Sequence, residues 1–334
     1  MKNVEENKVC SITGINGQTG SFLAELLLEK GYKVYGMVRK SSVFNTERIE
    51  NIYNHPNLKL IYGDLADTLS VVDFITQTRP DYFFNLGGLS HVRTSIDMPL
   101  SAIDVDGLGV VRCLEGIRKY SSHTRFLQAS TSELFGNSPA PQNELTPMVP
   151  CSPYSIGKLT GYSAVNYYKL AYGMFAVNAI SFNHESYRRN PTFVTRKITK
   201  TLSEIKLGLK TELNLGNLVS KRDFSHASDV AEAMYLMITA ENPENYVISS
   251  GETYSIEQFL DLVAAKLELN WKDYVKFDKR LLRPVEVNCL LGDSTKIRTE
   301  LSWKPKYNIN SLVDEMVEYD LKLARRQLLL KNNE

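Results

Sequence analysis

Gly14-Ile15-Asn16-Gly17-Gln18-Thr19-Gly20 lies between an apolar run at Val9 to Ile12 and an amphipathic helical pattern. Glycines at this spacing permit a tight turn and a close approach of the backbone to a pyrophosphate, whose charge the helix amino terminus favours. A glycine triplet alone also fits an ordinary strand-to-helix turn. Its place at the first βα junction of an alternating chain favours a dinucleotide site. The expected cofactor-binding residues here are Gly14, Asn16, Gly17, Gln18, Thr19 and Gly20.

Short apolar runs alternate with helical patterns through the first half of the chain. The expected strands are Val9 to Ile12, Lys33 to Val38, Leu58 to Tyr62, Tyr82 to Leu86, Arg125 to Ala129 and Phe175 to Phe182. This alternation predicts βαβ units and therefore an α/β fold with a Rossmann-type, doubly wound parallel sheet. A further helix is expected to start near Ser152.

The chain has 334 residues, which exceeds the usual size of one compact core. After Phe182 the alternation of strand and helix patterns becomes less regular. We therefore predict a mainly NADP-binding domain at 1–182 and a smaller, mixed α/β substrate lobe at 183–334, with the chain free to cross between them. In this second part we expect loops at 183–191 and 279–288, helices at 255–267 and 311–327, and a frayed tail at 331–334.

Composition excludes several classes of function. The chain has 39 Lys and Arg residues and 38 Asp and Glu residues, so its net charge is too small to attract nucleic acid or an anionic membrane. The four cysteines are scattered, which indicates neither a zinc site nor a redox pair and predicts no bound metal. The start, Met1 to Lys8, lacks the apolar core of a signal peptide, and no segment approaches the roughly 18 apolar residues of a membrane helix. We expect a cytoplasmic protein.

The end of the second strand indicates which dinucleotide binds. NAD sites usually place an acidic residue there to hold the ribose hydroxyls. This chain has Arg39-Lys40-Ser41-Ser42 instead. Cations and hydroxyls suit a 2′-phosphate, so the predicted cofactor is NADP, with Arg39 as its contact; a solvated basic turn is the alternative.

Two further strand ends fall at the edge where open α/β sheets bind ligands. Gly63-Asp64-Leu65 follows the third strand, and Asp64 is suited to accept from an adenine amino group. Asn85-Leu86-Gly87-Gly88-Leu89-Ser90 ends the fourth, where small residues let a cofactor pass close to the backbone. We therefore expect Asp64, Leu65, Leu86, Gly87 and Ser90 to contact the cofactor.

Tyr154 and Lys158 form a Tyr-x-x-x-Lys pair in the first turns of the helix after the fifth strand. One helical turn places both side chains on the same face. The ammonium is expected to lower the phenol pKa and make Tyr154 a general base. In isolation such a pair can be an ordinary surface pair without a function. However, the fifth strand ends in Gln128-Ala129-Ser130-Thr131-Ser132-Glu133, and these polar residues are expected to lie near Tyr154 and Lys158.

With these residues in place, the chain resembles the extended short-chain dehydrogenase/reductases, and among them the GDP-mannose 4,6-dehydratases, nearly from end to end. The runs that carry the resemblance are Thr13 to Ser21, Ser42 to Arg48, Ala129 to Gly136, Ser152-Pro153-Tyr154, Phe182 to Ser186 and Thr192 to Ile198.

The resemblance implies roles for four catalytic residues, Thr131, Glu133, Tyr154 and Lys158. Thr131 binds the reacting hydroxyl, Tyr154 is the base, and Lys158 holds the phenolate and the nicotinamide ribose. Glu133 distinguishes a dehydratase from a simple reductase, because dehydration requires a group that takes a proton from C5 and helps hydroxide leave C6. A carboxylate two residues beyond Thr131 lies on the same side if the strand pattern continues.

The resemblance also places GDP-mannose in the smaller lobe. It implies that Arg222, Arg283 and Lys197 bind the pyrophosphate, that Glu286 accepts from ribose hydroxyls, and that His184 and Arg189 lie at the cofactor end. The full set of implied substrate residues is Ser90, Asn183, Val194, Lys197, Gly216, Arg222, Arg283 and Glu286. The family forms homodimers or homotetramers, with the segment from Arg39 to Arg48 near a neighbour's cofactor.

Three departures from the family pattern, Tyr187, Phe224 and Ser101, affect the shape of the pocket and remove no catalytic group. Two other functions compete with GDP-mannose dehydration. The first is dehydration or 4-keto reduction of another GDP-hexose, and Glu133 argues against a reductase. The second is an idle NADP-binding scaffold, since fold alone does not establish function.

Overall fold

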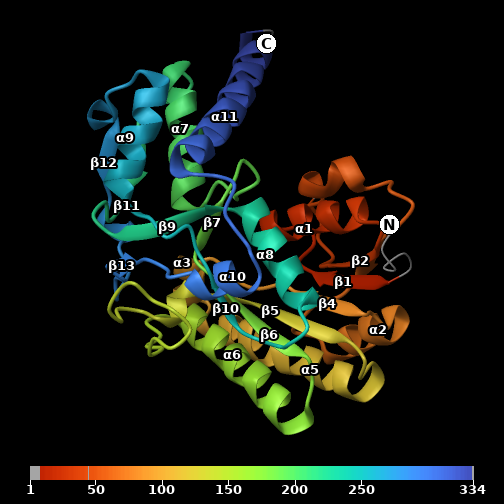
Figure 1. The fold of residues 1–334 in the computed structure, drawn as a ribbon. Coiled ribbons are helices and arrows are strands. Elements are labelled where there is room, and N and C mark those ends of the chain that lie inside the picture. Colours follow the sequence, from red (N-terminus) through yellow and green to blue (C-terminus); the bar gives the residue numbers. More distant parts are fainter. Residues whose placement is uncertain (1–7, 44, 333–334) are drawn as a thin grey trace.

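The computed structural model describes residues 8–43 and 45–332 (Figure 1). The start used above to argue against a signal peptide lies outside this range, apart from Lys8, as do Phe44 of the resemblance and residues 333–334 of the expected tail. Among the described residues, no helix is both long and apolar enough to cross a membrane.

The main sheet has seven parallel strands in the order β10-β6-β5-β4-β1-β2-β3, which confirms the predicted Rossmann-type architecture. Its strands are β1 (Val9–Thr13), β2 (Lys33–Val38), β3 (Leu58–Tyr62), β4 (Tyr82–Asn85), β5 (Arg125–Thr131), β6 (Ala176–Ser181) and β10 (Tyr246–Ile248). The central strands are buried on both faces, which explains their nearly continuous apolar sequence.

Helices cover both faces of this sheet (Figure 1). One face carries α1 (Gln18–Glu29) and α8 (Ala227–Thr239), and the other carries α2 (Thr68–Thr78), α5 (Gly109–Tyr120) and α6 (Pro153–Tyr172). Three short helices are α3 (Val92–Asp97), α4 (Pro99–Ile103) and α10 (Thr295–Glu300). A π-helical turn at Asp104–Leu108 joins α4 to α5. Because α8 and β10 follow residue 183, the chain does cross back to the main sheet.

A second hydrophobic core lies among α7 (Val194–Lys206), α9 (Ile256–Leu267) and α11 (Ile309–Asn332), at the upper left of Figure 1. The pair β8 (Leu213–Leu215) and β12 (Val275–Phe277) adjoins it. A small sheet is formed by β7 (Asn183–Glu185), β9 (Lys221–His226), β11 (Thr253–Ser255) and β13 (Cys289–Leu290). This sheet lies between the second core and the carboxyl edge of the main sheet (Figure 1).

Two expectations for the second half were wrong. The segment 183–191 was expected to be a loop, but it begins with β7, because Asn183 to Glu185 pair with Phe224 to His226 of β9. That partner lies some forty residues further on, so the local polar sequence gives no strand signal. The tail was expected to fray from Lys331, but α11 continues to Asn332.

Candidate active site

The glycine-rich turn between β1 and α1 has the geometry of a phosphate cradle. Gly14 has a φ of +69°, and a Cβ there would lie 2.8 Å from the Gly87 nitrogen. A Cβ at Gly20 would clash with the Gly14 carbonyl oxygen. Gly17 is the N-cap of α1, and no side chain caps its amides. The backbone N–H groups at the start of α1 are therefore free of side-chain caps, and the three glycines leave open space beside them. This arrangement is suited to bind the pyrophosphate of a dinucleotide.

One cleft of about 720 Å³ adjoins this cradle and extends to the small sheet. It is lined by every predicted site residue except Asp64 and Leu65. The predicted cofactor residues brought together are Gly14, Asn16, Gly17, Gln18, Thr19, Gly20, Arg39, Leu86, Gly87, Ser90, His184 and Arg189. The predicted substrate residues are Ser90, Asn183, Val194, Lys197, Gly216, Arg222, Arg283 and Glu286, and the four catalytic candidates are Thr131, Glu133, Tyr154 and Lys158.

Asp64 and Leu65 lie beside this cleft without lining it. The Asp64 carboxylate accepts from the backbone N–H of Ala66 at 3.0 Å and so closes its own turn. Leu65 is buried behind the glycine pair, since a Cβ at Gly87 would lie 2.9 Å from its Cδ1. Their contact with a cofactor stays a prediction.

Tyr154 and Lys158 are positioned by the start of α6. Ser152 and Ser155 form a capping box and Pro153 occupies the first turn, so this helix begins where the sequence predicted. Lys158 Nζ donates to the Ala129 carbonyl oxygen at 3.0 Å and lies 5.8 Å from the centroid of the Tyr154 ring. The expected proximity of ammonium and phenol is therefore present.

The expected lowering of the Tyr154 pKa is wrong for the protein by itself. Burial raises the pKa of Tyr154, and this effect outweighs the opposing effect of Lys158. Asp106 and Glu133 raise the pKa further, while a hydrogen bond from Thr131 lowers it. The sequence indicated Lys158 and Glu133 as site residues, but it did not indicate Asp106 or the degree of burial.

Glu133 reaches the cleft by a different route from the one expected. The strand alternation does not continue to Glu133, because β5 ends at Thr131 and a 3₁₀ turn follows at Ser132–Leu134. The Thr131 hydroxyl oxygen accepts from the Glu133 N–H at 3.2 Å and caps this turn. A turn rather than a strand therefore places the carboxylate beside Thr131.

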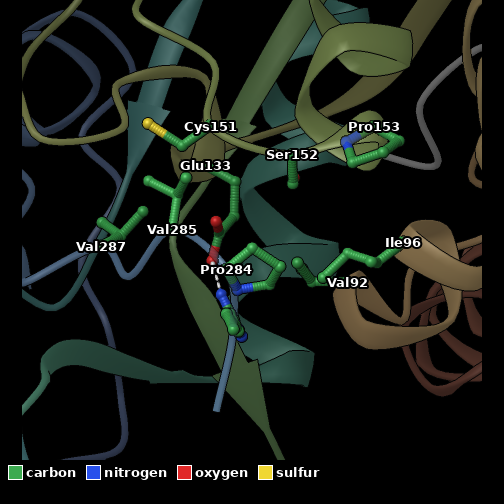
Figure 2. Close-up of a pocket in the computed structure, with 10 residues that line it drawn as sticks. Val92, Ile96, Glu133, Cys151, Ser152, Pro153, Pro284, Val285 and Val287 are labelled. Carbon is green, nitrogen blue, oxygen red and sulfur yellow. Dashed lines mark hydrogen bonds and ion pairs between the residues drawn. The ribbon is translucent and has the colours of Figure 1, made fainter.

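Figure 2 shows Glu133 pointing into a side pocket of about 130 Å³ next to the main cleft. Its walls are largely apolar and include Val92, Val285 and Pro284. The guanidinium of Arg283 lies 3.3 Å from Glu133 Oε1. Arg283, expected to bind a pyrophosphate, thus also contacts the candidate acid/base group.

The part of the cleft predicted to bind substrate carries several cations. Arg222 is buried and donates to the Val287 carbonyl oxygen at 2.9 Å, and burial lowers its pKa. Lys197 Nζ donates to the Asn214 carbonyl oxygen, and burial lowers the pKa of Lys197 as well. Glu286 Oε1 accepts from the Arg283 N–H at 3.0 Å. Cations that have lost hydration are suited to bind an anion of matching shape.

The residues of β7 and the loop after it close the other end of the cleft. Gln18 donates to the His184 carbonyl oxygen and accepts from the Ser186 hydroxyl, so the glycine-rich helix is tied to this segment. Burial lowers the pKa of His184 to about 4, and the imidazole is therefore neutral at pH 7. Arg189 forms an ion pair of 3.1 Å with Glu185.

The three departures occupy different places. Tyr187 packs against Tyr319, with 4.8 Å between ring centroids, and Phe224 lines the cleft while packing against Phe259. Ser101 lies in α4 and does not line the cleft.

Sequence reasoning missed three residues at this site. His91 and Phe193 line the cleft with 5.0 Å between their ring centroids, and Asp106 forms an ion pair with Lys158. His91 follows the fourth-strand turn directly, so its position was a usable signal. Asp106 offered no such sequence signal, because the residues around it form an ordinary helical pattern.

A parallel Rossmann-type sheet, a glycine cradle and a buried Tyr-x-x-x-Lys pair in one cleft define an extended short-chain dehydrogenase/reductase. Solved structures with this fold include a dTDP-glucose 4,6-dehydratase from Bacillus anthracis in complex with NAD (TM-score 0.82, 21% identity, 94% of this chain and 97% of that one). A UDP-glucose 4-epimerase from Thermotoga maritima with UDP-glucose is also similar (TM-score 0.84, 23% identity, 94% and 99%).

Sequence comparison is more specific. The family model described as GDP-mannose 4,6 dehydratase matches residues 12–316. GDP-mannose 4,6 dehydratase 2 of Arabidopsis thaliana is 46% identical over 98% of this chain and 90% of its own length. The human GDP-mannose 4,6 dehydratase is 44% identical over 95% and 92%. The chain belongs to the GDP-mannose 4,6-dehydratase family.

Proposed function

We propose that this protein is an NADP-dependent lyase that converts GDP-mannose to GDP-4-keto-6-deoxymannose. The observation that carries the proposal is that Glu133, Thr131 and Tyr154 line one cleft with the cationic groups of the smaller lobe. Family membership and the names of relatives across nearly the whole chain support the same substrate and reaction.

In the proposed reaction, bound NADP⁺ would supply the hydride acceptor for C4 and the hydride donor for C6. Tyr154 takes the proton from O4, Thr131 binds the same oxygen, and Lys158 stabilises the phenolate. The resulting 4-keto group acidifies the proton on C5. Glu133 then removes that proton and assists departure of the C6 hydroxyl as water. Addition of hydride at C6 is accompanied by return of a proton to C5, so the cycle leaves no net oxidation.

Incubation with GDP-mannose and a trace of NADP⁺ tests this proposal. We expect mass spectrometry to show a nucleotide sugar that has lost one water, without stoichiometric consumption of NADPH. Reduction of a GDP-4-keto-6-deoxyhexose by added NADPH, with no loss of water from GDP-mannose, would indicate the 4-keto reductase. Binding of both sugars without turnover of either would indicate the idle scaffold.

The preference for NADP is proposed from Arg39, which lines the cleft after β2 where NAD sites carry an acid. Arg39→Ala should weaken NADP⁺ binding roughly ten- to hundredfold, the equivalent of about 1.5 to 3 kcal/mol for a charge-assisted contact, and leave NAD⁺ binding nearly unchanged. Titration calorimetry with both nucleotides measures this. Lys40→Ala is the matched control, because Lys40 Nζ lies over the Tyr62 ring, 4.7 Å from its centroid. Equal affinities of the parent for both nucleotides would contradict the prediction.

Arg222→Ala should raise the Michaelis constant for GDP-mannose roughly ten- to hundredfold and lower turnover much less. The proposed contact is with the pyrophosphate, which does not react, so ground and transition states lose it equally. Steady-state kinetics measures the split, with exposed Lys221→Ala on the same strand as control. An unchanged Michaelis constant for Arg222→Ala would remove Arg222 from the substrate site.

We also propose a homodimer or homotetramer, as the family resemblance implies. Exposed apolar side chains on α6, namely Ile156, Tyr167 and Leu170, support self-association.

A further inference from the structure

Asp106 is a buried carboxylate that the proposed mechanism does not use. It is only 1% exposed and lies in the π-helical turn between α4 and α5. Its Oδ1 lies 3.5 Å from Lys158 Nζ and accepts from the Leu89 N–H at 3.2 Å. Its Oδ2 has no hydrogen-bond partner among the described residues. Burying a carboxylate is costly unless it is paired, and Lys158 is the cation that pairs with Asp106.

The surrounding backbone is built to allow this contact. A Cβ at Gly88 would clash with Asp106 Oδ1 and lie 3.3 Å from Lys158 Nζ. A Cβ at Gly157 would lie 3.2 Å from Asp106 Cβ, and one at Gly161 would lie 2.9 Å from the Asp106 carbonyl oxygen. Gly157 and Gly161 therefore let the π-helical turn approach α6 closely, and Gly88 lets the turn after β4 approach Asp106 and Lys158. Such turns occur frequently at functional sites.

The groups that face Lys158 define what Asp106 does. They are the Ala129 carbonyl from β5, the Tyr154 phenol from its own helix, and Asp106; Glu133 acts on Tyr154 from the 3₁₀ turn. Burial is the largest single effect on Lys158 and lowers its pKa, but Asp106 and Tyr154 together outweigh burial, and the net pKa is raised. Without the carboxylate, the effect of burial would dominate.

We propose that Asp106 is a positioning residue that keeps Lys158 protonated and directs its ammonium toward Tyr154 and the Ala129 carbonyl. The inference rests on the proposed function only in taking Tyr154 and Lys158 as the catalytic pair. Asp106 touches no reacting atom and acts through Lys158.

Asp106→Asn tests this inference, with Asp104→Asn as the matched control. Asp104 lies in the same turn, but its carboxylate pairs with Arg112 at 2.7 Å and not with Lys158. We expect Asp106→Asn to lower kcat by about 10²-fold, the cost typical of a misplaced catalytic group, with a smaller effect on the Michaelis constant. The alkaline limb of the kcat profile should move to lower pH, because Lys158 then loses its proton more easily. Asp104→Asn should show neither change.

A double-mutant cycle with Lys158→Met separates a positioning role from a structural one. Asp106→Asn should lower Tm in the parent, where it leaves a buried ammonium unpaired, and raise Tm in Lys158→Met, where it removes an unpaired carboxylate. In that second background it should cause no further loss of activity. The doubly substituted protein has no unpaired charge at this site and should fold even if the single variant does not.

Two measurements do not depend on the proposed reaction. NMR titration of labelled lysine side chains, with the Lys158 signal assigned by its loss in Lys158→Met, should show its pKa falling in Asp106→Asn. If the titration and the Tm cycle behave as expected but GDP-mannose is not dehydrated, the proposed function is wrong and this inference stands. An unchanged Lys158 pKa, or the same sign of Tm change in both backgrounds, would overturn the role of Asp106.

Discussion

Glu133→Gln should lower the rate of dehydration about 10²- to 10⁴-fold, the usual contribution of a positioned acid or base. Glutamine keeps the size of the side chain and a contact to Arg283 but cannot accept the C5 proton. Oxidation at C4 depends on Tyr154 and Lys158 and should persist. In a single turnover we therefore expect NADPH absorbance to accumulate together with a 4-keto sugar that retains its 6-hydroxyl.

Exchange of the C5 hydrogen with solvent deuterium should disappear in the same variant. Glu144→Gln is the control, because Glu144 is a carboxylate that accepts from the Val247 N–H outside the cleft. Near-parental dehydration by Glu133→Gln would show that Glu133 is not the acid/base group, and the reductase interpretation would then gain support.

Tyr154→Phe should lower turnover by a similar factor, about 10²- to 10⁴-fold, but at an earlier step. Without the phenol nothing takes the O4 proton as C4 is oxidised, so no NADPH should accumulate in a single turnover. Stopped-flow absorbance distinguishes the two variants directly. Tyr167→Phe, on an exposed position of the same helix, should leave the rate unchanged.

The pH dependence gives a second test of Tyr154. Because burial raises the pKa of Tyr154, the active phenolate should form only as pH increases, and kcat/KM should rise with pH through the neutral range. A Tyr154→Phe variant that keeps both this rise and the parental rate would exclude Tyr154 as the base.

Local sequence patterns predicted six of the seven strands of the main sheet, because their signals are short in range, but they did not predict β10. The strand at Lys33–Val38 and the strand at Leu58–Tyr62 were predicted to the residue, since each is an apolar run bounded by turn residues. The start of α6 followed from Ser152 and Pro153, because serine at the N-cap and proline in the first turn are typical of a helix start. β7 could not be predicted, because its pairing with β9 is a long-range contact.

The sequence by itself determined six strands of the parallel sheet, the glycine cradle and the Tyr154–Lys158 pair, because each strand, turn or helix start is encoded by residues close together in the chain. Only the tertiary structure decided the electrostatics of the site. It brought Asp106 from the π-helical turn to Lys158, and Arg283 from the segment between β12 and β13 to Glu133. It also buried Tyr154 enough to raise its pKa where the local pattern predicted the opposite. Charge interactions and desolvation depend on distance and burial in space, and neither follows from spacing along the chain.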